Sequence, residues 1–205
     1  MKKNLIPDEA IKRLYFYLRC LMDFHNTGKE KVSSNEIADY FKLNSAQVRK
    51  DLSYFGDFGK KGVGYDTAIL IQEIRDILKL NREWKIAIVG IGNIGSALSL
   101  YQGFKKYGFI ITYAFDNDVK KIGQKAGNLV IEDVKNLEKI VKNNNIKIAI
   151  ISTSENSAQK TADLLVSSGI KTILNFAPLH LDVPEEIKVS YVDISAKLGG
   201  LTYYL

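Results

Sequence analysis

The amino-acid sequence predicts an α/β protein with two domains, and three observations support this prediction. Residues 7–80 carry apolar side chains at helical spacing, with one glycine-rich interruption. From about residue 85, short runs of β-branched residues alternate with helical periods, a pattern typical of a doubly wound parallel sheet. The chain has 205 residues, 46% of them hydrophobic, which is enough for two small cores. We therefore expect domains at 1–82 and 83–194, followed by a C-terminal segment at 195–205.

Two helices are predicted at the start of the chain. Pro7 suits a first helical turn, where its missing N–H is not needed, and apolar residues recur at helical spacing over 11–22. Ser33 and Glu36 have the spacing of a capping box, in which each side chain accepts the other residue's backbone N–H. The box predicts the start of a second helix, which we expect to end near Phe41.

A third helix, a hairpin and a fourth helix follow. The third helix is predicted over 44–55, because apolar residues there recur at i, i+4 and i+7. Four glycines within 56–65 exclude a helix and predict a hairpin. Asp66 is then suited to cap a fourth helix that ends near Leu80.

This element order predicts a winged helix-turn-helix domain, with 44–55 as the DNA recognition helix. Gln and Arg side chains read base edges, whereas Lys, Ser and Tyr contact phosphates, and lysines at a glycine-rich hairpin tip reach a backbone or minor groove. A solvated helix face beside an ordinary surface hairpin is the alternative. The predicted nucleic-acid contacts are Ser45, Gln47, Arg49, Lys50, Ser53, Tyr54, Lys60, Lys61 and Tyr65.

The second domain is predicted to alternate strands with helices. The expected strands are 85–89, 110–115, 129–131, 146–151, 172–175 and 189–192. The expected helices are 94–107, 134–143 and 157–168. Because the strands are almost uninterrupted apolar runs, we expect helices to cover both faces of their sheet.

Gly90, Gly92 and Gly95 form a G-x-G-x-x-G motif that follows the first of these strands and opens a helix. The three glycines provide a tight turn, close approach of the backbone to a pyrophosphate, and close packing of helix on sheet. The start of the helix offers N–H donors and the positive end of its dipole. Asp116, 21 residues after Gly95, is placed to accept hydrogen bonds from ribose hydroxyls.

The motif therefore predicts a Rossmann-like domain that binds NADH or NAD+. Asp116 disfavours a 2′-phosphate and hence NADP(H), although Lys120 and Lys121 nearby leave that choice open. A plain strand-to-helix turn and an S-adenosylmethionine site are the alternatives. The predicted cofactor contacts are Gly90, Ile91, Gly92, Asn93, Ile94, Gly95, Asp116, Thr153, Asn175, Phe176, Ala177 and Pro178.

Few residues suit catalysis or metal binding. Of the two histidines, His180 follows a loop where a nicotinamide would lie, but a solvated loop histidine is the more ordinary interpretation. The single Cys20 has no cysteine partner for a disulfide or a metal site. We predict no catalytic residue and no metal, and keep an NAD-dependent oxidoreductase with an N-terminal accessory domain as the alternative function.

Composition gives weaker guidance on partners and location. The net charge of +6 permits nucleic-acid binding, but the basic excess is shared evenly by the two halves of the chain. The sequence has no apolar run long enough for a membrane span and no apolar stretch of a signal peptide near its start. We expect a cytoplasmic protein with no membrane partner.

A DNA reader joined to a dinucleotide-binding fold resembles the Rex family of redox-sensing transcriptional repressors. The resemblance rests on Ile6-Pro7, Arg13-Leu14, the runs 45–52, 58–59, 62–65 and 90–95, and Asn175-Phe176-Ala177-Pro178. It implies a homodimer that binds operator DNA and releases it when NADH binds, with the C-terminal helix exchanged between subunits. Gly199 and Gly200 weaken that helix intrinsically. A regulator whose N-terminal helices bind protein is a third possibility.

The resemblance also implies contacts that sense the cofactor state, made by Arg19, Tyr101 and Asp193. From its position alone, Asp193 is suited equally to cap the last helix, to bind a ribose or to pair with a cation. A carboxylate near the nicotinamide would favour cationic NAD+. We therefore expect the preference for NADH to arise from an apolar pocket that includes Phe176, while Asp193 exchanges partners between Arg19 and Tyr101.

Overall fold

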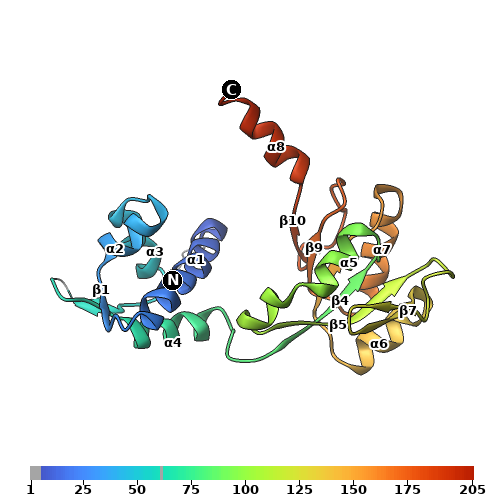
Figure 1. Cartoon of the computed structure of the whole chain (residues 1–205), viewed down its shortest axis with the longest axis horizontal. Helices are drawn as coiled ribbons and strands as arrows, with labels where there is room; N and C mark the ends of the chain where they lie inside the picture. Colours follow the sequence, from blue (N-terminus) through green and yellow to red (C-terminus); the bar gives the residue numbers. More distant parts are fainter. Residues whose placement is uncertain (1–5, 61) are drawn as a thin grey trace. The chain divides into compact units, whose positions relative to one another are not determined.

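A computed structural model describes residues 6–60 and 62–205 of the chain. The chain forms two compact units that divide between Arg82 and Glu83, and Figure 1 shows their elements.

The first unit contains four helices and a small sheet within the described residues. Its elements are α1 (Asp8–Asn26), β1 (Lys31–Val32), α2 (Ser34–Phe41), α3 (Ser45–Ser53), β2 (Gly59–Lys60), β3 (Gly64–Asp66) and α4 (Thr67–Ile77). The strands pair antiparallel in the order β1-β3-β2. The core is formed by inward residues of all four helices, among them Leu14, Leu18, Ile37, Val48, Leu70 and Ile74. The predicted helices and hairpin are all present, whereas β1 has only two residues and was not predicted.

Side-chain caps fix where these helices begin. Ser33 and Glu36 form the predicted capping box: Glu36 N donates to Ser33 Oγ at 3.2 Å, and Ser33 N donates to Glu36 Oε2 at 2.8 Å. Asp66 Oδ1 accepts from Ile69 N at 3.0 Å and caps α4. Asn44, which was not predicted as a cap, accepts from Ala46 N at 2.8 Å at the start of α3.

The capping box makes the first unit sensitive to acid. The Lys29 ammonium and the Ser33 donors lower the pKa of Glu36 from 4.5 to about 2. A depressed carboxyl pKa stabilises the fold above the unfolded value and loses that contribution as the pH falls toward the folded value. We expect the free energy of unfolding to decline between pH 4.5 and about 2. Urea unfolding over this range checks it: the Glu36→Gln variant should lose less stability on acidification, and an equal loss would contradict the assignment.

The second unit is built on a seven-stranded sheet in the order β10-β9-β8-β4-β5-β7-β6. The strands are β4 (Trp84–Val89), β5 (Phe109–Asp116), β6 (Lys125–Ala126), β7 (Leu129–Asp133), β8 (Ile148–Ile151), β9 (Thr172–Asn175) and β10 (Lys188–Tyr191). All neighbouring pairs are parallel except β6 and β7. The predicted parallel sheet is therefore confirmed for six strands, whereas the sheet as a whole is mixed, because β6, a two-residue edge strand with no clear sequence pattern, turns back on β7.

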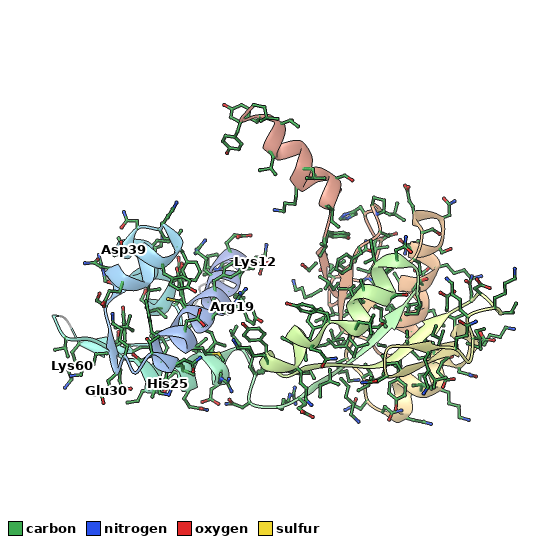
Figure 2. All side chains as sticks on the ribbon, in the orientation of Figure 1. Lys12, Arg19, His25, Glu30, Asp39 and Lys60 are labelled. Carbon is green, nitrogen blue, oxygen red and sulfur yellow. The ribbon has the colours of Figure 1, made fainter. Side chains whose placement is uncertain are left out.

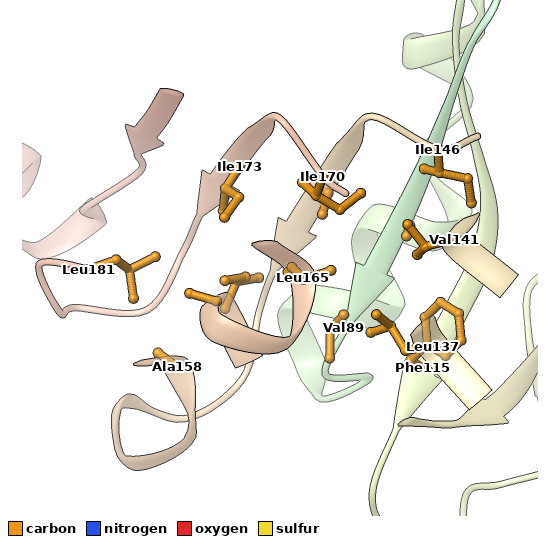
Figure 3. Packing of buried hydrophobic residues seen from close by; sticks show 14 of the residues in the cluster. Val89, Phe115, Leu137, Val141, Ile146, Ala158, Leu165, Ile170, Ile173 and Leu181 are labelled. Carbon is orange, nitrogen blue, oxygen red and sulfur yellow. The ribbon is translucent and has the colours of Figure 1, made fainter. Parts of the chain in front are cut away.

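Helices cover both faces of this sheet. They are α5 (Asn93–Leu100), η1 (Gln102–Tyr107), η2 (Val134–Asn136), α6 (Leu137–Asn143) and α7 (Glu155–Ser167). The last helix of the unit, α8 (Ile194–Thr202), covers neither face. Successive residues of β4 point to opposite faces. Ala87 and Val89 pack with buried residues of α6 and α7, as the cluster in Figure 3 shows. Ile86 and Ile88 belong to a second cluster, against which Leu98 of α5 packs.

The single helix predicted over 94–107 is wrong. It breaks at Tyr101, whose backbone is extended (φ −75°, ψ 106°), and continues as the short helix η1. The Tyr101 ring lies over Gly103, where a Cβ would come within 2.3 Å of the ring. The ring also meets Phe104 edge-on at 4.9 Å between centroids. The predicted helix over 134–143 is likewise divided, into η2 and α6.

The last helix, α8, has no packing partner inside the second unit. All its residues are exposed, including Leu198 and Leu201 at 61% each. Figure 1 shows α8 following β10 and standing clear of the sheet. Along the described residues, no helix is long and apolar enough to cross a membrane. A grouping of three or more His, Cys, Asp or Glu side chains that would hold a metal is likewise absent from residues 6–60 and 62–205.

Candidate functional site

The first element of the site is the turn between β4 and α5, at the centre of the sheet. Strand β4 lies between β5 and β8, so the strands that follow it are added first on one side of β4 and later on the other. Where the strand order reverses in this way, a crevice forms at the carboxyl ends of the strands. Gly90 has φ +93°, and a Cβ there would lie 2.7 Å from Thr153 N. A Cβ on Gly95 would lie 2.0 Å from Gly90 O. The protein's own packing therefore requires two of the three motif glycines.

Gly92 is different, because a Cβ there would meet nothing within 4 Å and its φ of −87° is open to any residue. It is also the N-cap of α5, where no side chain caps the helix. The first N–H groups of α5 therefore donate to no capping side chain, and Gly92 beside them has no side chain that would block a ligand. A phosphate group fits this arrangement.

Asp116 ends β5 beside the glycine turn. It is 6% exposed, and its Oδ2 accepts from Ile91 N at 2.8 Å and from Lys121 Nζ at 3.1 Å. Its Oδ1 accepts from Asp118 N at 2.9 Å. Burial alone would raise the pKa of Asp116, but these backbone donors and the Lys121 ammonium lower it below the ordinary value. The carboxylate is thus held ionised at the edge of the crevice.

A cavity of about 470 Å³ opens at this edge. Gly90, Gly92, Asp116 and Thr153 line it, so four predicted cofactor contacts come together. Thr153 Oγ1 is buried with no hydrogen-bond partner among the described residues. A cavity of this size with a bare helix N-terminus, an ionised carboxylate and an unpaired hydroxyl fits part of an adenine dinucleotide.

Other predicted cofactor contacts lie outside the lining of this cavity. Ile91 is 4% exposed and contributes its N–H to Asp116, while Gly95 is buried beneath the turn. Asn93 and Ile94 are exposed on the first turn of α5. The lining instead includes polar residues that were not predicted, at the end of β8 and in α7: Ser152, Ser154, Asn156, Ser157, Lys160 and Thr161. The polar run after the apolar strand at 148–151 was the signal for them.

The loop after β9 is organised by Asn175. This residue is fully buried; its Nδ2 donates to Ala177 O at 3.1 Å and to Leu179 O at 2.9 Å, and its Oδ1 accepts from Ala177 N at 2.9 Å. Phe176 is partly buried and packs against the apolar cluster that contains Ile86 and Ile88, whereas Pro178 is exposed. The Asn175 side chain therefore shapes the loop, and Phe176 and Pro178 are the side chains left partly open.

Of the three residues predicted to sense the cofactor state, Asp193 has a clear local role. Asp193 Oδ1 accepts from Ala196 N at 2.8 Å and caps α8, one of its three predicted roles. Tyr101 is 60% exposed next to α5. Arg19 is an exposed residue of α1, labelled in Figure 2. His180 is exposed and stacks on the Tyr191 ring at 5.3 Å between centroids.

In the first unit, α3 and the hairpin flank a groove of about 750 Å³. Arg49, Ser53, Lys60 and Tyr65 line it, and Arg49 Nη1 donates to Ser34 Oγ at 3.0 Å. Figure 2 labels Lys60 in the hairpin. Four of the predicted DNA contacts therefore share one concave surface.

The remaining predicted DNA contacts differ in exposure. Lys50 is exposed, and Ser45 and Tyr54 are partly exposed. Gln47 is partly buried and points its amide toward Asp51, its Nε2 donating to Asp51 Oδ1 at 2.8 Å. Tyr65 lies over Gly59, where a Cβ would come within 2.6 Å of its ring. Lys61 lies outside the described residues.

Comparisons with known proteins cover both units of the chain. Residues 5–53 match a family described as putative DNA-binding protein N-terminus, and residues 81–179 match the CoA-binding domain family. The redox-sensing transcriptional repressor Rex of Chloroflexus aurantiacus is 46% identical over 204 residues, which cover 100% of this chain and 96% of the relative. The Rex repressor of Desulfitobacterium hafniense is 45% identical over 203 residues, or 99% of this chain and 97% of the relative.

Solved structures lead to the same conclusion. RSP, a Rex-family repressor, has been solved with NAD+ and operator DNA; it aligns with a TM-score of 0.93 at 33% identity over 98% of this chain and 93% of its own. The complex of RSP with NADH aligns with a TM-score of 0.87 at 31% identity, over 98% and 94% of the two chains. With relatives this similar over its whole length, the chain belongs to the Rex family of redox-sensing transcriptional repressors.

Proposed function

We propose that this chain represses transcription as a homodimer that binds operator DNA through α3 and the hairpin and releases it when NADH binds. The observation that carries the proposal is that one chain combines the glycine turn, where α5 begins without a side-chain cap, with a groove that Arg49 and Lys60 line. A solved member of the same family binds NAD+ with operator DNA and also binds NADH. The function is regulatory and not enzymatic, since the relatives are repressors.

The glycine turn and β5 hold the cofactor in this proposal. Gly90, Gly92 and the first N–H groups of α5 bind the pyrophosphate, and Asp116 accepts from the adenosine ribose. The unpaired Thr153 hydroxyl supplies a further hydrogen bond. When bound, NADH and NAD+ differ by one positive charge on the nicotinamide ring. The residues around that ring must therefore distinguish a neutral group from a cation.

The partly buried Phe176 supports an apolar nicotinamide pocket that penalises the cation. Asn175 keeps the loop in shape while Phe176 provides the surface. In the Phe176→Ala variant we expect the ratio of the NAD+ to the NADH dissociation constant to fall several-fold, mainly because NAD+ binds better. Calorimetric titration with each cofactor measures the ratio. An unchanged ratio would refute the pocket argument.

The exposed α8 supports a homodimer in which this helix packs against the partner subunit. Leu198, Leu201 and Tyr204 present apolar surface with no cover inside the second unit. Two recognition helices in one dimer must stand about 34 Å apart to enter successive major grooves. We further propose that Arg19, Tyr101 and Asp193 change partners as the cofactor changes, so that the spacing of the helices follows the redox state.

A charge in the centre of this apolar face should separate the subunits. We expect Leu198→Asp to produce monomers, because the α8 surface would then bury an unpaired carboxylate. Sedimentation velocity measures the mass directly. Lys197→Asp, a neighbouring charge change on the same exposed helix, serves as the control. A dimeric Leu198→Asp protein would overturn the role given to α8.

Fluorescence anisotropy with a labelled palindromic duplex tests the proposed function as a whole. We expect tight, salt-dependent binding that NADH abolishes and NAD+ preserves. A steady NADH absorbance in the presence of small carbonyl compounds distinguishes the repressor from the oxidoreductase alternative. If binding to duplex DNA showed no steep salt dependence, the alternative of a regulator whose N-terminal helices bind protein would be favoured.

A further inference from the structure

A buried carboxylate joins the recognition helix α3 to α1. Asp51 is fully buried, and its Oδ2 accepts from Arg13 Nε at 2.6 Å and from Tyr17 OH at 2.7 Å. Its Oδ1 accepts from Arg13 Nη2 at 2.9 Å and from Gln47 Nε2 at 2.8 Å. Four donors from three side chains therefore converge on one carboxylate.

The charge state of this cluster is well defined. Burial alone would raise the pKa of Asp51, but the donors from Arg13, Tyr17 and Gln47 lower it below its ordinary value. An ionised carboxylate only accepts hydrogen bonds, so the Gln47 amide must turn its NH2 group toward Asp51. This requirement fixes the orientation of the amide by chemistry.

Gln47 is also less exposed than the basic residues of α3. Arg49, Lys50 and Ser53 are exposed, whereas Gln47 is partly buried at the flank where α3 meets α1. Its spacing of four residues from Asp51 brings the two side chains together on one helix face. The side chain that the sequence assigned to base reading is therefore engaged inside the domain.

We propose that Gln47 is a positioning residue, which with Arg13 and Tyr17 sets the pose of α3 through Asp51 and does not read a base. This inference rests on the proposed DNA-binding function and assigns a different task to one residue within it. Arg13 and Tyr17 anchor the carboxylate from α1, and Gln47 closes its remaining side from α3. Base reading and phosphate contact fall to the exposed face of α3.

The test measures Gln47→Ala against a panel of duplexes, each with one operator base pair changed. A base contact is worth about 1–3 kcal/mol at its own position, so removing a base reader relaxes specificity at that pair. We expect Gln47→Ala to weaken binding to every duplex by one common factor, and to leave the slope of affinity against salt unchanged. Lys50→Ala is the matched control, since loss of a phosphate contact lowers that slope.

A double-mutant cycle shows whether Gln47 acts through Asp51. Tyr17→Phe removes one hydroxyl from the cluster and keeps the ring in the core, so the domain is expected to fold. Because both side chains act on one carboxylate, the effects of Gln47→Ala and Tyr17→Phe on operator affinity should be non-additive. Circular dichroism of each variant confirms that the helices are retained.

The outcomes separate this inference from the proposed function. A Gln47→Ala protein with relaxed specificity at one base pair, or effects that add within error to those of Tyr17→Phe, would overturn the inference and leave the repressor intact. A wild-type protein that binds no duplex would overturn the proposed function, and the inference with it.

Discussion

Replacing Gly92 by Ala is expected to weaken NADH binding strongly while leaving the protein as stable as the wild type. A Cβ at Gly92 would meet nothing within 4 Å in the protein, so the fold accepts it. It would, however, project where a pyrophosphate must approach the start of α5. Losing two charge-assisted hydrogen bonds of about 1.5 kcal/mol each weakens binding by about a hundredfold. Calorimetry measures the affinity, and thermal unfolding measures the stability.

Gly95→Ala provides the contrast. A Cβ there would lie 2.0 Å from Gly90 O, so α5 must move away from the turn. We expect this variant to lose stability as well as NADH affinity. If Gly92→Ala bound NADH like the wild type, the pyrophosphate would not lie at the start of α5. The Gly92→Ala protein should remain on the operator at NADH concentrations that release the wild type, because in the proposed function operator binding does not use Gly92.

Lys50→Ala is expected to abolish operator binding at physiological salt with NADH affinity unchanged. Lys50 is exposed on α3, and the proposed homodimer would lose two copies of the proposed contact at once. If each copy neutralises one phosphate, the slope of log affinity against log salt should fall by about 2. Anisotropy titrations at several salt concentrations give both quantities.

Lys139→Ala is the matched control for Lys50→Ala. Lys139 is an exposed lysine of α6 in the second unit, so the variant carries the same change of net charge away from the recognition helix. We expect it to bind the operator nearly as the wild type does. An equal loss of operator affinity in both variants would indicate that binding depends on the net charge of the protein and not on the position of Lys50. A loss of NADH affinity in Lys50→Ala would indicate misfolding.

Local sequence signals predicted much of this fold. The capping box of Ser33 and Glu36, the cap at Asp66 and the glycine turn at 90–95 depend on residues a few positions apart, and each forms in the structure as expected. The apolar periods that define the sheet and its helices are also local. These features were accessible because the residues that signal each of them lie close together in the sequence.

Other features were not accessible, because they leave no apolar pattern in the sequence or depend on distant contacts. The break at Tyr101 depends on its ring lying over Gly103, and the antiparallel pairing of β6 involves only two residues. Gln47 was predicted to contact DNA, but its amide donates to Asp51 inside the domain. The sequence did not reveal this bond, because Asp51 is held by Arg13, which lies 38 residues earlier in the chain. Helical spacing places Gln47 at the edge of the face, and only the buried charge beneath decides which way it turns.

The central claim is that cofactor and operator oppose each other through one protein, and reciprocity tests it most directly. If NADH weakens operator binding by a given factor, bound operator must weaken NADH binding by the same factor. Calorimetric titration of NADH into the free protein and into the preformed complex with a palindromic duplex measures the second factor. We predict that it equals the first, as obtained by anisotropy, and that NAD+ shows no such loss. An NADH affinity that is the same with and without operator would contradict the account.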